Sequence, residues 1–155
     1  MEKEGDMDLN RFEHSVDEIL LNHDIKPTTQ RKTILHYLLE IEDHPSVEQI
    51  LTGLAKRGEK ISRATVYNVL NLFEDKNIIK VIAVNNNVKH YDINFTDHGH
   101  FICTNCNVIY DVDLPKSVTY HQVFNLARDV AISDINVVLR GICQSCQKIL
   151  KNKVN

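Results

Sequence analysis

The sequence predicts an α+β protein in two parts, a helical N-terminal part that ends in a β-hairpin and a smaller C-terminal α/β part. Three observations predict this fold. Apolar residues recur at helical spacing through about the first 80 residues, and then at every second residue. All four cysteines lie in the last third of the 155-residue chain, in two Cys-x-x-Cys pairs. We place the boundary between residues 93 and 94.

Four helices are predicted in the first part. A threonine pair, Ser46 and Ser62 can start the second, third and fourth helices, because a side-chain hydroxyl can accept from a free backbone N–H. Ser46 and Gln49 also have the spacing of a capping box, and Asn77 suits a left-handed helix end. The predicted helices span 9–23, 28–41, 46–58 and 62–77. The residues expected to be buried are Leu9, Phe12, Val16, Ile19, Leu20, Ile34, Leu35, Leu38, Leu39, Val66, Leu70 and Phe73.

A β-hairpin is predicted at about 78–93, with a turn at Asn85, Asn86 and Asn87. Short helices followed by a hairpin are typical of a winged helix-turn-helix, in which the helix before the hairpin is the recognition helix. The alternative is a small helical bundle with an incidental hairpin.

The second part, 94–155, is predicted to contain strands at 100–103, 108–112 and 135–143 and a helix at 116–130. Val118, Val123 and Leu126 would form the buried face of that helix. A unit of about 60 residues has a thin core and usually needs a disulfide, a metal or a partner for stability.

Charge and hydropathy limit the function without identifying it. The net charge is −3, with −4 in residues 1–93 and +1 in residues 94–155, so nucleic-acid binding would depend on local basic patches. No apolar stretch reaches the ~20 residues needed to span a membrane. The acidic N-terminus is unlike a secretory signal, so we expect a cytoplasmic protein without a membrane partner.

The cysteines predict one structural zinc site. Cys103 and Cys106 are separated from Cys143 and Cys146 by 36 residues. Four thiolates suit tetrahedral Zn²⁺, and each Cys-x-x-Cys pair can hold one edge of the ion. Four buried free thiols would not need this double spacing, and a thioredoxin-type redox pair would need only one Cys-x-x-Cys.

A second metal site is predicted from histidines and aspartates. His98 and His100 lie two apart and face the same side of a strand, whereas Cys103 would turn to the other side. With His44, Asp92 and Asp111 they form a set of three nitrogens and two oxygens, which suits Fe²⁺, Mn²⁺ or Zn²⁺. Alone, two such histidines would more often be ordinary surface residues.

The remaining histidines are expected not to bind metal. His14, His23, His36 and His121 fit solvated helix positions. His90 precedes Asp92 by two residues and could share its face, so whether it joins the site stays open.

Several motifs together resemble the ferric uptake regulator (Fur) superfamily, and within it most closely the peroxide-sensing PerR branch. They are "TTQR", "HPS", "SRATVYNVL", "HYD", "DHGHFICTNC", "VIYD" and "GICQSC", and they cover about Lys26 to Cys146. The resemblance implies a homodimeric repressor with a winged-helix DNA-binding domain and a C-terminal dimerisation domain. It also implies one regulatory metal ion per subunit, with ligands from both domains.

The resemblance further assigns the DNA contacts and the sensing chemistry. It implies that Arg63, Ala64, Thr65 and Tyr67, with Asn68, contact a palindromic operator. Asp111 and Gly99 match the PerR branch, because iron-uptake regulators typically have Glu at the first position and often an extra ligand at the second. In that branch, iron and H₂O₂ oxidise the histidines that match His44 and His98.

Three alternatives remain. The protein could sense the level of iron, zinc or manganese instead of peroxide. A zinc hydrolase or deaminase is a distant alternative, because a deaminase needs a general acid/base Glu and no Glu occurs from residue 75 to 155. A zinc-ribbon adaptor that does not bind DNA would leave the "SRATVYNVL" helix unexplained.

Overall fold

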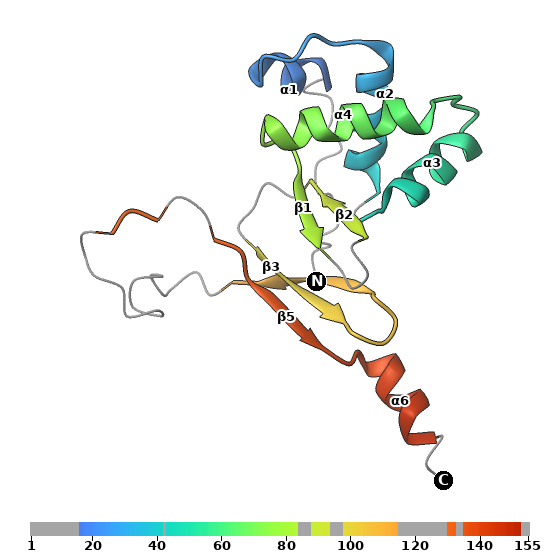
Figure 1. The fold of residues 1–155 in the computed structure, drawn as a ribbon, viewed down its shortest axis with the longest axis vertical. Helices are drawn as coiled ribbons and strands as arrows, with labels where there is room; N and C mark the ends of the chain where they lie inside the picture. Colours follow the sequence, from blue (N-terminus) through green and yellow to red (C-terminus); the bar gives the residue numbers. More distant parts are fainter. Residues whose placement is uncertain are drawn as a thin grey trace, which may run out of the picture. The chain divides into compact units, whose positions relative to one another are not determined.

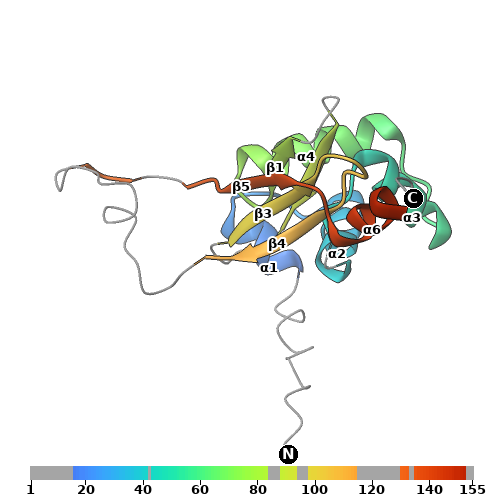
Figure 2. The ribbon, with the colours of Figure 1, turned by 90° about the horizontal axis from the view of Figure 1, so that it is seen from below.

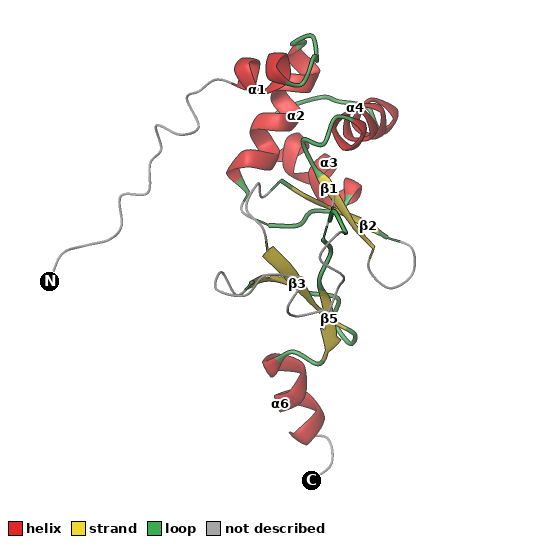
Figure 3. Ribbon diagram, turned by 90° about the vertical axis from the view of Figure 1, so that its left-hand side faces the viewer, coloured by secondary structure: helices red, strands yellow, loops and turns green. Residues whose placement is uncertain are grey.

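The computed structural model describes residues 16–41, 43–83, 88–93, 98–114, 130–132 and 135–152. The chain divides into two compact units, Met1–Asn94 and Phe95–Asn155. Figure 3 shows that both units contain helices and strands, so the predicted combination of helices and sheets is confirmed.

The first unit contains four helices, α1 (Val16–Asn22), α2 (Thr29–Glu40), α3 (Val47–Lys56) and α4 (Arg63–Asp75) (Figure 1). The predicted starts of the last three are confirmed. Thr28, Ser46 and Ser62 are the N-caps, and each side chain accepts a hydrogen bond from a backbone N–H three residues later. Ser46 and Gln49 form the complete capping box.

These helices enclose one apolar core. Leu20, Ile34, Leu35, Leu38, Val66, Leu70 and Phe73 are buried as predicted, and Val16, Ile19 and Leu39 pack against them half-buried. Full burial of such a side chain stabilises the fold by about 1.5–3 kcal/mol. The predicted burial of Leu9 and Phe12 lies outside the described residues.

The core supports a two-stranded antiparallel hairpin, β1 (Lys80–Ala83) and β2 (Lys89–Asp92). Asn77, at the end of α4, has a φ of 56°, the left-handed conformation predicted for it. The predicted turn at Asn85–Asn87 lies outside the described residues.

The second unit contains a three-stranded sheet in the order β4-β3-β5, seen from another side in Figure 2. The strands are β3 (His98–Cys103), β4 (Ile109–Asp113) and β5 (Val138–Gly141). β3 pairs antiparallel with β4 and parallel with β5. The predicted helix at 116–130 falls almost entirely outside the described residues.

A helix that the sequence analysis did not predict, α6 (Gln144–Asn152), follows β5 and carries Cys146. In the described part of the chain, no helix has the length and apolar character to cross a membrane.

Candidate metal centres and nucleic-acid interface

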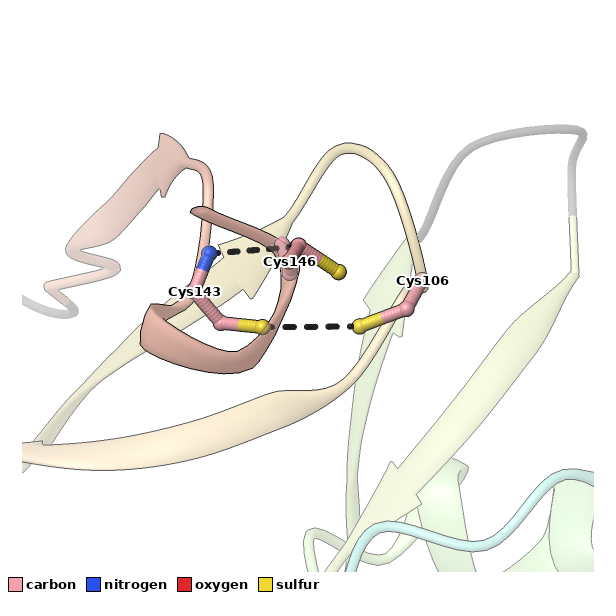
Figure 4. Close-up of side chains that lie close together, drawn as sticks. Cys106, Cys143 and Cys146 are labelled. Atoms are coloured by element: carbon pink, nitrogen blue, oxygen red, sulfur yellow. Dashed lines mark hydrogen bonds between the residues drawn. The ribbon is translucent and has the colours of Figure 1, made fainter. Parts of the chain in front are cut away.

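The four cysteines converge in the second unit. Cys103 ends β3, Cys106 lies in the following turn, Cys143 follows β5, and Cys146 is in α6. Their sulfur atoms all lie within 4.8 Å of one another, and the Sγ atoms of Cys106 and Cys143 are 3.7 Å apart (Figure 4). A tetrahedral zinc ion with Zn–S bonds of ~2.3 Å separates its sulfurs by about 3.8 Å, so the donor set fits Zn²⁺.

Backbone pairing brings the two Cys-x-x-Cys segments together. Cys103 lies opposite Gly141 in the parallel β3–β5 ladder. The backbone N–H of Thr104 donates to the Gly141 carbonyl at 2.8 Å, and its hydroxyl donates to the same oxygen at 3.2 Å. Asn107, with φ 60°, turns the chain back, and its N–H donates to the Cys103 carbonyl at 2.9 Å. The parallel strand therefore joins segments that lie far apart in sequence.

Two polar contacts act on the sulfur atoms themselves. The backbone N–H of Cys143 donates to Cys103 Sγ at 3.3 Å, and this bond is the largest of several hydrogen bonds that lower the pKa of the Cys103 thiol to about 6. The amide of Asn105 donates to Cys146 Sγ at 3.1 Å and lowers the pKa of that thiol, but burial and the neighbouring thiols outweigh it and raise the pKa to about 12. Crowded thiols resist becoming thiolates together, and a divalent cation removes that resistance.

The second unit also gathers two histidines and an aspartate on β3 and β4. His100 lies directly opposite Asp111 in the antiparallel ladder, and His98 lies two residues before His100 on the same face. The two histidine Nε2 atoms are 2.9 Å apart, and they lie 3.6 Å (His98) and 3.9 Å (His100) from Asp111 Oδ1. Two nitrogens and a carboxylate oxygen thus converge as they would around a cation.

In the first unit, His44 and Asp92 come together. Nε2 of His44 is 3.9 Å from Oδ1 of Asp92, and both side chains are buried. His44 precedes α3 and Asp92 ends β2. The backbone N–H of Tyr91 donates to the Pro45 carbonyl at 3.0 Å, which ties the loop before α3 to β2.

His90 contacts the loop that carries His44. Its Nδ1 lies 2.6 Å from the carbonyl oxygen of His44, and because a carbonyl can only accept, Nδ1 must carry the proton. His90 also faces Ser46 in an isolated β-bridge. It therefore contacts the backbone of a predicted ligand.

Of the other histidines, His23 contacts the Ile19 carbonyl at 2.8 Å, and His36 pairs with Glu40 at 3.3 Å. These are ordinary helix-surface contacts. His14 and His121 lie outside the described residues.

The helix α4 presents an exposed stripe of side chains to solvent. Arg63, Ala64, Tyr67 and Asn68 are exposed, and they recur on one side of the helix at the spacing of its turns. Thr65 differs, because it is half-buried and its hydroxyl lies 2.8 Å from the Ser62 hydroxyl in the helix cap. Val66, Val69 and Leu70 are buried on the opposite side and fix the orientation of the stripe.

Three neighbouring residues were not assigned a role by the sequence analysis. Glu48 pairs with Arg63, Asn105 contacts Cys146, and His90 contacts His44. The contacting residues are 15, 41 and 46 positions apart in the sequence, respectively, so no local spacing could have shown these contacts.

Comparison with known proteins gives one consistent result. The sequence model of the ferric uptake regulator family matches residues 22–140 of this chain. The peroxide-responsive repressor PerR of Staphylococcus epidermidis is 27% identical over an alignment of 144 residues, which covers 91% of this chain and 96% of that protein.

Solved structures agree. The crystal structure of the Vibrio cholerae ferric uptake regulator matches with a TM-score of 0.70 and 26% identity, covering 83% of this chain and 100% of that chain. The ferric uptake regulator from Francisella tularensis with iron matches with a TM-score of 0.62 and 26% identity, covering 79% and 95%.

Proposed function

Since the chain belongs to the ferric uptake regulator family, whose members are metal-responsive transcriptional repressors and not enzymes, we propose that it represses transcription until it senses hydrogen peroxide. It would act as a homodimer on a palindromic operator in the reducing cytoplasm. The observation that carries the proposal is the convergence of His98, His100 and Asp111. Position 111 holds an aspartate and not a glutamate.

We assign DNA binding to the first unit, as a winged helix-turn-helix with α4 as the recognition helix and β1–β2 as the wing. The exposed stripe of α4 supports this assignment. Arg63 can bind a phosphate or a guanine, Ala64 can contact a thymine methyl, and Tyr67 can contact a thymine methyl or a phosphate. Asn68 extends the stripe, and Thr65 would act at the start of the helix.

The stripe can be tested by substitution. Arg63→Ala and Tyr67→Ala should each weaken operator binding by ~1–3 kcal/mol if they read bases, because a bidentate or methyl contact would be lost. The operator is obtained by selecting random duplexes with the Mn²⁺-loaded protein, and affinity is measured by fluorescence anisotropy. Equal affinity in both variants, with unchanged folding and metal content, would move the DNA contact away from α4.

We assign a structural zinc ion, one per subunit, to Cys103, Cys106, Cys143 and Cys146. Bound zinc would neutralise the thiolate charges and hold the two Cys-x-x-Cys segments together. The 3.7 Å spacing of two of the sulfurs and the backbone N–H directed at Cys103 support this assignment.

We assign a regulatory Fe²⁺ or Mn²⁺ ion, one per subunit, to His44, Asp92, His98, His100 and Asp111. The first two would come from the DNA-binding unit and the last three from the dimerisation unit. An ion with ligands from both favours one mutual orientation by its differential affinity for it. That orientation would hold two recognition helices at the spacing of successive major grooves.

Peroxide sensing would work through the same ligands. The proposed ligands would hold Fe²⁺, which when bound supplies redox chemistry toward H₂O₂. One oxygen atom of H₂O₂ would be inserted into the imidazole of His44 or His98, and the other would leave as water. An oxidised imidazole is a poorer donor, so metal affinity would fall and the repressor would leave DNA. Asp111 would hold its ion with a short arm on β4.

One assay separates this function from its nearest rival. The selected operator is titrated with protein loaded with Fe²⁺ or Mn²⁺, before and after H₂O₂. We expect release only from the Fe²⁺ form, with one added oxygen on the peptide containing His44 or His98. The rival is a regulator of metal level, which the likeness to iron-uptake regulators favours. If H₂O₂ releases the Fe²⁺ form without histidine oxidation, or does not release it at all, the protein is a regulator of metal level.

A further inference from the structure

An ion pair holds the first residue of α4. The two terminal nitrogens of the Arg63 guanidinium donate to the two carboxylate oxygens of Glu48, Nη1 to Oε1 and Nη2 to Oε2, the second at 2.7 Å. Glu48 lies in the first turn of α3. An arginine uses the same two-point geometry to bind a phosphate or the O6/N7 edge of guanine. Glu48 therefore occupies the edge of the guanidinium that DNA would need.

The pair is not required to build the core or to start the helix. The side chains of Arg63 and Glu48 are 57% and 61% exposed, and Ser62 already caps α4. A cation in the first turn of a helix is disfavoured by the helix dipole, and the Glu48 carboxylate offsets that cost while raising the pKa of Arg63. The carboxylate thus neutralises an arginine at the end of the exposed stripe of α4.

Three other exposed cations of the first unit also pair with carboxylates, but not with Glu48. Lys32 lies 3.0 Å from Asp17, Lys89 lies 3.8 Å from Glu74, and Arg57 pairs with Glu40. Among the residues that the structure describes, Glu48 is the carboxylate that pairs with a proposed DNA contact. These pairs fit a DNA-binding unit whose net charge is −4 over residues 1–93.

We propose that Glu48 competes with DNA for Arg63 and thereby lowers the affinity of the repressor for its operator. The inference rests on the proposed role of α4 in DNA binding. When DNA binds, the guanidinium releases the carboxylate and takes a phosphate or guanine in its place, while Glu48 turns to water. Part of the energy of the new contact is spent on breaking the old one.

The test is a double-mutant cycle with Glu48→Gln and Arg63→Ala in the full-length, Mn²⁺-loaded dimer. Gln keeps the shape and polarity of Glu48 but not its charge. We expect Glu48→Gln to bind the selected operator roughly two- to five-fold more tightly, the range that an exposed ion pair allows. The slope of log affinity against log salt should steepen by about one, because a carboxylate no longer takes up a cation when Arg63 leaves it. In the Arg63→Ala background the gain should disappear.

Glu40→Gln is the matched control, because it removes one negative charge from the same unit and frees Arg57 rather than Arg63. A gain in Glu40→Gln as large as that in Glu48→Gln, or a gain that persists without Arg63, would show a general charge effect and overturn the proposal. Unchanged or weaker binding by Glu48→Gln would overturn it too. If Arg63→Ala itself binds normally, the assignment of α4 to DNA fails as well; if only Arg63→Ala weakens binding, only the competition fails.

Discussion

The four cysteines come from one compact unit, whereas the five residues proposed for the regulatory ion are divided between two. Strand pairing inside the second unit aligns Cys103 with Gly141 and so gathers the thiols. The same unit gathers His98, His100 and Asp111, but His44 and Asp92 belong to the other unit. An ion held by one unit contributes to the folding of that unit, and an ion shared by two contributes to their orientation. In the proposed function, this difference would separate a structural site from a sensing site.

The largest effect should come from breaking the cysteine site. Cys143→Ser removes one sulfur ligand and leaves three thiols crowded around an incomplete site, so zinc should be lost. Because zinc binding supplies folding energy in so small a unit, the dimer should be lost with it. Zinc per subunit, measured by mass spectrometry of the metal, should fall from about one to near zero.

A Cys143→Ser protein that stays zinc-loaded and dimeric would contradict the structural role proposed for the zinc ion. Gln144→Ser, on the neighbouring exposed residue, is the matched control and should keep both properties.

The next effect should come from removing one regulatory ligand from each unit. His44→Ala and His98→Ala should both retain structural zinc and the dimer, yet both should lose Mn²⁺-dependent operator binding. The reason is that a shared ion needs ligands from both sides. Calorimetric Mn²⁺ titration and operator anisotropy measure the two losses. If only His98→Ala loses Mn²⁺ and His44→Ala binds it normally, the ion belongs to the second unit alone and the contrast between the sites is wrong.

A smaller change at Asp111 should separate binding from sensing. Asp111→Glu keeps the charge and the oxygen donors, and the 44% exposed side chain leaves room for a longer arm. Metal-dependent repression should therefore survive. The longer arm can shift the ion and close the position that peroxide needs, so histidine oxidation after Fe²⁺ and H₂O₂ should fall well below the wild-type level.

Mass spectrometry of the peptides containing His44 and His98 measures that oxidation. Equal oxidation in wild type and Asp111→Glu would show that the length of the side chain at position 111 does not set peroxide sensitivity. The absence of oxidation in the wild type itself would favour a regulator of metal level.

Local sequence patterns predicted the helices of the first unit because capping and apolar spacing act over three or four residues. Ser46 and Gln49, for example, form their capping box wholly within one helix start. The grouping of His98 with His100 was also predictable, since residues two apart on a strand share a face. The alignment of Asp111 with His100 depends on the strand register, which the pattern could not define.

The supporting contacts were not predictable in the same way, and the helix α6 was missed although a short signal for it exists. Cys146, Ile149 and Leu150 recur at helical spacing, but α6 has only nine residues and Ile149 and Leu150 are exposed in the structure. Asn105 and His90 act on partners 41 and 46 residues away, through contacts that exist only after the strands have paired. Residue spacing in the sequence therefore does not predict long-range polar contacts.

The smallest effect concerns His90, which supports one centre and not the other. Its protonated Nδ1 lies 2.6 Å from the His44 carbonyl, and this bond holds the backbone of a proposed ligand against β2. His90→Ala should leave His44 less well positioned, and loss of such a supporting contact typically costs 10–100-fold in metal affinity, so we expect about a tenfold weaker Mn²⁺ site. His90→Asn places an amide N–H near the position of Nδ1 and should retain most of the affinity. Structural zinc should be unchanged in both variants, because the cysteine site has its own support from Asn105. Mn²⁺ titration of the zinc-loaded dimer measures the difference. Equal Mn²⁺ affinity in wild type and His90→Ala would reduce His90 to a residue of the hairpin, whereas a tenfold loss in both variants would instead make its ring, and not the hydrogen bond, the feature on which the site depends.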